Sequence, residues 1–109
     1  MLTDKPLISF IPTVHPKKAL AFYKDTLGLR LLSKDQFALV FDAHGTTLRV
    51  TIVPKLHPHS FTVLGWNVPD ITSTISALRK KSVVFEQYEF MKQDKLGIWT
   101  SPSGAKIAW

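Results

Sequence analysis

The sequence predicts an α+β fold made of two copies of one strand–helix–strands unit. Short apolar runs typical of strands alternate with stretches of helical periodicity along the whole chain. The order of strand, helix and two or three further strands occurs twice, and the two helix starts, His15 and Asp70, are 55 positions apart. The turn glycines Gly45 and Gly104 are 59 positions apart. These spacings indicate an internal repeat; the alternative is a single α+β domain whose pattern repeats by chance.

The first module is expected to begin with a buried strand and a helix. Leu7–Val14 is a short apolar run bounded by prolines, as buried strands are. Pro16 suits the first turn of the helix that follows, where its missing N–H is not needed. Gly28 suits a left-handed cap at the end of that helix. The apolar face of the helix is formed by Leu20, Tyr23 and Leu27.

Three strands should complete the first module. Leu29–Ser33 is followed by the polar pair Lys34 and Asp35, and Phe37–Asp42 alternates between apolar and polar residues. A turn at Ala43-His44-Gly45 leads into Thr47–Val53, which alternates again. One face of the middle strand is predicted to carry Phe37, Leu39 and Phe41.

The second module is expected to repeat this order after a proline-containing linker at Pro54–Ser60. Phe61–Val68 is predicted as a strand, and Asp70 as the N-cap of a helix. Val83–Phe85 is predicted to start another strand, and residues 97–109 a hairpin with a turn at Pro102-Ser103-Gly104. The apolar face of the second helix is formed by Ile71, Ile75 and Leu78. The predicted modules are residues 1–55 and 60–109 of a single domain.

Composition excludes several classes of function. The 109 residues are 45% apolar and 20% charged, as in soluble globular proteins, and no apolar run is long enough to span a membrane. The absence of cysteine excludes disulfides, thiol catalysis and thiolate metal sites. The N-terminus is a poor signal peptide, so a cytoplasmic location is expected. The net charge of +6 comes from scattered basic residues, which favours a solvated basic surface over nucleic-acid binding.

Two motifs resemble the vicinal oxygen chelate superfamily, which includes glyoxalase I, bleomycin-resistance proteins and extradiol dioxygenases. The phrase A-F-Y-x-x-x-L-G-L of the first helix stands here as Ala21–Leu29, and the second module's V-x-D stands as Val68-Pro69-Asp70. The resemblance implies two βαβββ modules whose mixed sheets curl around one cavity, with the helices outside. It also implies a homodimer, since a partner subunit often completes the cavity. The closing strand is either the hairpin over residues 97–109 or missing, and a missing strand would leave a sheet edge free to pair.

Enzymes of this superfamily usually hold a divalent metal with His, Glu or Gln side chains. The corresponding positions of this chain fall near Ile8, Arg49 and Val63, and none of these can replace an imidazole or a carboxylate. We therefore expect no metal and no other cofactor. A divalent metal held by residues such as His57 or His59 is the alternative, and it would make the chain a lyase of the glyoxalase I type or an extradiol-type dioxygenase.

The candidate ligand-binding residues are Arg49, Thr51, Phe10, Asn67 and Val63. Arg49 projects from a strand whose other face is apolar, and the resemblance implies that its face lines the cavity. A cavity arginine would bind a carboxylate or phosphate through paired hydrogen bonds; the alternative is an arginine that simply faces solvent. The first hypothesis is a metal-free, dimeric protein that binds a small anionic or aromatic molecule. An enzyme and a basic interaction module are the competing classes.

Overall fold

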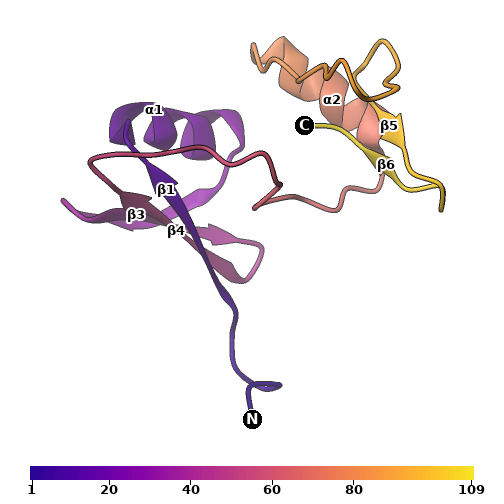
Figure 1. Cartoon of the computed structure of the whole chain (residues 1–109). Helices are drawn as coiled ribbons and strands as arrows, with labels where there is room; N and C mark the ends of the chain where they lie inside the picture. The colour runs from indigo at the N-terminus through magenta and orange to yellow at the C-terminus, as the bar shows by residue number, and fades with distance from the viewer. The chain divides into compact units, whose positions relative to one another are not determined.

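The structure is a computed structural model that describes residues 1–109. It divides into two units, Met1–Gly65 and Trp66–Trp109, which are described separately. Figure 1 colours the chain from indigo at the N-terminus to yellow at the C-terminus. No helix is long and apolar enough to cross a membrane.

The first unit contains a four-stranded mixed sheet. Its strands are β1 (Ile8–Thr13), β2 (Arg30–Lys34), β3 (Ala38–Ala43) and β4 (Thr46–Ile52), in the order β1-β4-β3-β2. β1 runs parallel to β4, and the other two pairings are antiparallel. The first predicted βαβββ module is therefore confirmed, with strand ends within about two residues of those expected.

The hairpin between β3 and β4 has the predicted turn. His44 and Gly45 have φ angles of 52° and 87°, and the N–H of Gly45 donates to the Asp42 carboxylate at 3.1 Å. Two successive left-handed residues twist a hairpin in the sense of its strands, which is why a glycine occurs here.

The helix of the first unit departs from regular geometry. It begins as α1 (Pro16–Leu20) and continues as a π-helix, η1 (Ala21–Thr26), in which the N–H of Leu27 donates to the carbonyl of Phe22, five residues earlier, at 2.9 Å. Leu20 and Tyr23 pack on the core as predicted, but Leu27 is not part of that cluster. The wider π turn changes the angular spacing of side chains, so the 3.6-residue period fails there.

The core of the first unit lies between this helix and one face of the sheet, and Figure 1 shows α1 along that side. Phe41 and Val50 are fully buried, whereas Phe37 is 61% exposed. The prediction that Phe37 joins the apolar face is wrong. It precedes β3, in a turn where its N–H donates to the Asp35 carboxylate at 2.7 Å. The buried residues of this core are Ile11, Ala19, Leu39, Phe41, Leu48 and Val50.

The second unit contains one helix and a small hairpin. In α2 (Ile71–Lys80), the Asp70 carboxylate accepts the N–H of Ser73 at 3.1 Å, which confirms the predicted N-cap. The hairpin pairs β5 (Trp99–Thr100) with β6 (Lys106–Ile107), also as predicted.

Two strands predicted for the second module do not form. Phe61–Val68 and Val83–Phe85 have no strand structure, and Phe61 and Val63 are 62% and 65% exposed. A strand is held by hydrogen bonds to a neighbouring strand, and alternation of residue types does not supply that neighbour. Consequently the α+β class and one βαβββ module are present, while a second complete module and a curled sheet are not seen.

Side chains organise the segment that precedes the hairpin. The Gln93 amide donates to the carbonyls of Glu86 and Gly97 at 2.9 and 2.8 Å, and its oxygen accepts the N–H of Tyr88 at 2.7 Å. Trp109 lies 5.8 Å from Tyr88 and 6.4 Å from Trp99, measured between ring centroids. Two of the tryptophans therefore belong to an aromatic cluster of the second unit.

Candidate functional site

Phe10 and Arg49 are brought side by side by the parallel pairing of β1 with β4. In this register Phe10 is opposite Arg49, and Pro12 is opposite Thr51. Leu48 and Val50 are buried in the core. Since successive residues of a strand point to opposite faces, Arg49 and Thr51 lie on the face away from α1.

We call this surface the Arg49 face. Phe10 is 65% exposed there and Ile8 is 50% exposed, while Arg49 and Thr51 are half-buried. The face thus combines apolar surface, hydroxyl groups and one guanidinium. It consists of Ile8, Phe10 and Pro12 on β1, Thr47, Arg49 and Thr51 on β4, and Ala38 and Val40 on β3.

The charges around this face leave the Arg49 guanidinium without a carboxylate within 4.0 Å. Arg30 of β2 differs, because one of its nitrogens lies 3.8 Å from an Asp42 oxygen. Asp35 accepts hydrogen bonds from two backbone N–H groups, and these lower the pKa of its carboxyl, with a further contribution from the charge of Arg49. The Asp35 carboxylate is therefore satisfied by the backbone, and the five donors of Arg49 have no ion-pair partner.

The other two candidate residues do not join this group. Val63 lies in an irregular segment and is 65% exposed, and Asn67 belongs to the second unit and is exposed there. Neither lies in a strand of the four-stranded sheet. The structure brings together Phe10, Arg49 and Thr51, and their assignment to a ligand site stays a prediction.

The residues of the chain form no group suited to a metal ion. No three His, Cys, Asp or Glu side chains are gathered at one place. His57 and His59 are exposed in the segment after β4, and the His59 ring stacks on Phe61 with centroids 4.9 Å apart. The residues therefore do not fit the divalent metal that the superfamily resemblance implies.

Two hollows flank α1, on the other side of the sheet. One has a volume of about 390 Å³ and an apolar floor that includes Leu20 and Leu39, with Lys17, Lys34 and Asp35 among its other lining residues. Sequence reasoning missed both hollows, because it treated the basic residues of the chain only as a solvated surface.

The other hollow has a volume of about 280 Å³ and lies at the junction of β1 and α1. The spacing of His15, Lys18 and Phe22 along the helix was the one signal that could have indicated a shared face. Its lining residues are Pro12, Thr13, His15, Lys18, Ala19, Phe22 and Tyr23.

Comparison with known proteins identifies the fold. No family model matches the sequence, and no curated protein matches it either. Solved structures do match over nearly the whole chain. TnmS3, an antibiotic binding protein from Streptomyces sp. CB03234, is 21% identical with a TM-score of 0.65, over 99% of this chain and 95% of that one.

Two further matches are similarly complete. A member of the glyoxalase/bleomycin resistance protein/dioxygenase superfamily from Sphaerobacter thermophilus is 17% identical, with a TM-score of 0.63 over 99% of this chain and 97% of that one. Lactoylglutathione lyase from Agrobacterium tumefaciens is 12% identical, with a TM-score of 0.60 over 99% and 93%. The chain has the fold of this superfamily, which confirms the resemblance seen in the sequence.

Proposed function

We propose that this protein binds a small organic molecule with an aromatic ring and an anionic group on the Arg49 face, without a metal. The ligand's carboxylate or similar anion would accept hydrogen bonds from the Arg49 guanidinium. Its ring would lie against Phe10, with the Thr51 hydroxyl beside the anion. Val63, which lies in the same unit after β4, is a further candidate contact for the ligand.

The main support for this proposal is that Phe10 of β1 lies opposite Arg49 of β4 in the strand register. Neighbouring strands are about 4.8 Å apart, so an aromatic ring and a guanidinium at paired positions on one face suit a single small ligand. A planar guanidinium binds a carboxylate through two parallel hydrogen bonds, and an exposed phenyl ring supplies apolar area. Phe10 is 65% exposed, and covering it would gain part of the free energy of transferring that ring from water.

Two further observations support binding over metal chemistry. The positions at which the superfamily usually places metal ligands hold Ile8, Arg49 and Val63, and none of these side chains suits a divalent metal. In addition, one protein of similar fold is described as an antibiotic binding protein. The identity of the ligand within the anionic aromatic class is part of what the experiment must determine.

We also propose that the working form is a homodimer in which a second copy encloses the ligand. An exposed apolar surface that includes Ile8 and Phe10 on the edge strand β1 is typical of an interface or a ligand site. Light scattering after gel filtration should give twice the chain mass of 12.3 kDa. A mass of one chain at all concentrations would contradict the dimer without affecting the site.

Ligand binding can be tested with naphthalene-2-carboxylate as the probe, followed by shifts of backbone amide signals in ¹⁵N–¹H NMR spectra. We expect the amides of Phe10, Arg49 and Thr51 to shift, and the neutral naphthalene-2-carboxamide to bind more weakly. Arg49→Met should weaken binding about 10- to 100-fold, the usual loss for a charge-assisted hydrogen-bonded pair.

Arg30→Met is the matched control, since Arg30 lies on the same sheet but already has Asp42 as a partner. It removes the same charge and should change the affinity less than threefold, because exposed charges act weakly through water. Equal losses in the two variants would contradict the proposal. Stoichiometric Zn, Ni, Mn or Fe in the freshly purified protein would favour the metal-dependent alternative instead.

A further inference from the structure

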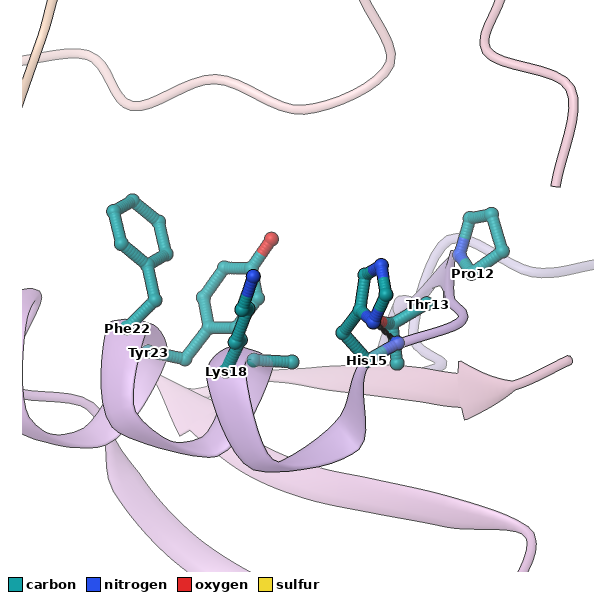
Figure 2. Close-up of a pocket in the computed structure, with 7 residues that line it drawn as sticks. Pro12, Thr13, His15, Lys18, Phe22 and Tyr23 are labelled. Atoms are coloured by element: carbon teal, nitrogen blue, oxygen red, sulfur yellow. Dashed lines mark hydrogen bonds between the residues drawn. The ribbon is translucent and has the colours of Figure 1, made fainter.

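The hollow at the junction of β1 and α1 is a second candidate site, which shares only Pro12 with the Arg49 face. It is lined by Thr13 at the end of β1, by His15 before the helix, and by Lys18, Phe22 and Tyr23 on the helix. Figure 2 shows the side chains of His15, Lys18, Phe22 and Tyr23 pointing to the same side of the helix. At about 280 Å³, the hollow is of a size for a small molecule rather than for a single water.

The charge of this hollow is positive. Lys18 supplies an ammonium group with three donors, and His15 adds an imidazole, while no aspartate or glutamate lines the hollow. The larger hollow on the other flank of α1 differs, because Asp35 lies there together with Lys17 and Lys34. A cationic lining without a carboxylate selects an anion.

The Thr13 hydroxyl is already oriented. Its oxygen accepts the backbone N–H of His15 at 3.0 Å, which Figure 2 marks with a dashed line. A hydroxyl that accepts one hydrogen bond keeps its own hydrogen for donation. Thr13, His15 and Lys18 thus offer three separate donors, which suits an anion with several oxygens, such as a phosphate, better than a carboxylate with two.

The opposite end of the hollow is aromatic. Phe22 and Tyr23 meet edge to face with ring centroids 5.2 Å apart, and Tyr23 is anchored in turn 5.8 Å from the fully buried Phe41. Burial raises the pKa of the Tyr23 hydroxyl above its ordinary value. At either value the phenol is neutral at physiological pH and can donate a hydrogen bond. Phe22 is 39% exposed, and its ring is available to a ligand at low entropic cost.

The geometry points to a binding site for a small aryl phosphate, with the phosphate against Thr13, His15 and Lys18 and the ring against Phe22. This site does not depend on the Arg49 face. The two proposals are distinguishable because their residues have separate backbone amide signals, so either one can fail alone.

Phenyl phosphate is the probe for this site, with inorganic phosphate and phenol as its two halves. In ¹⁵N–¹H NMR spectra we expect phenyl phosphate to shift the amides of Thr13, His15, Lys18 and Phe22. Phenyl phosphate should bind at least about tenfold more tightly than inorganic phosphate, since covering the ring adds apolar burial. Equal affinity for the two, or shifts centred on Arg49, would overturn the assignment.

Variants separate this site from a general effect of surface charge. Lys18→Gln should weaken phenyl phosphate binding about tenfold, the usual effect of losing one charge-assisted hydrogen bond. Lys17→Gln removes the same charge from the neighbouring residue, which does not line this hollow, and should stay within twofold. Equal effects of the two substitutions would overturn the site. Phe22→Ala should weaken phenyl phosphate but not inorganic phosphate, and a retained spectrum will show that the variant is folded.

Discussion

The two faces of the four-stranded sheet differ in how deeply their side chains are buried, and substituting one valine on each face tests this difference. Val50 on β4 packs between the sheet and α1 and is fully buried. Val40 on the neighbouring β3 is opposite Arg49 in the register and is half-buried on the Arg49 face. Val50→Ala and Val40→Ala delete the same atoms from adjacent strands.

The expected magnitudes follow from burial. Losing two buried carbons costs about 1.6 kcal/mol in transfer free energy, and the residual cavity raises the total for Val50→Ala to about 2–3 kcal/mol. Val40 is partly in contact with water already, so Val40→Ala should cost less than about 1 kcal/mol. Alanine also has a lower strand propensity than valine, and this cost affects both variants. Most of that cost cancels when the loss of stability of one variant is subtracted from that of the other.

Urea unfolding followed by far-UV circular dichroism measures both losses. All three tryptophans lie in the second unit, so their fluorescence reports that unit separately from the sheet. We expect Val50→Ala to reduce the free energy of unfolding by at least about 1 kcal/mol more than Val40→Ala. Equal losses, or a larger loss for Val40→Ala, would falsify the assignment of faces and with it the placement of Arg49 away from the helix.

Two further predictions concern the Asp70 cap and the Asp35 turn. Asp70→Ala should lower the free energy of unfolding by about 1 kcal/mol because the N–H of Ser73 loses its acceptor. Asp70→Ser should retain most of the parent stability, since serine also caps helices. Urea unfolding of the two variants and the parent measures both effects. The Asp35 carboxyl has a pKa below its ordinary value, so its stabilising effect is complete above the unfolded-state pKa and is lost as the pH falls towards the folded-state pKa. In an acid titration of the parent, the amide signals of Phe37 and Ala38 should therefore move together below about pH 4. In Asp35→Ala these signals should not move over the same pH range. Movement of the signals in both proteins would contradict the role of the Asp35 carboxylate.

The first half of the fold was predictable because its signals are local. Proline at the start of α1, the His44-Gly45 turn and the alternation in β4 each act over a few residues. The Asp70 cap in the second half is of the same kind. The Phe61–Val68 strand is different, since a strand requires a partner that no local pattern specifies.

The candidate site likewise combines features that the local sequence predicts with features that depend on distant segments. Arg49 and Thr51 could be placed on one face from the two-residue period of their strand. That Phe10 lies directly opposite Arg49 depends on a parallel register between segments almost 40 residues apart, and periodicity carries no information about it. Val63 and Asn67 were assigned by resemblance, and the structure places neither on the sheet.

The hollow at the start of α1 depends on two levels of structure. Helical spacing puts His15, Lys18 and Phe22 on neighbouring turns, and this could be read from the sequence. Tyr23 and Thr13 join them only because α1 packs on the sheet and β1 ends beside it.

The sequence by itself determined the α+β class, the first βαβββ module, and the caps and turns. These depend on residue types and on contacts between near neighbours in the chain. Only the tertiary structure decided the pairing of β1 with β4, the face on which Arg49 lies opposite Phe10, and the hollows beside α1. The physical reason is that strand partners and cavity walls come from distant segments, whose contacts form only when the whole unit packs.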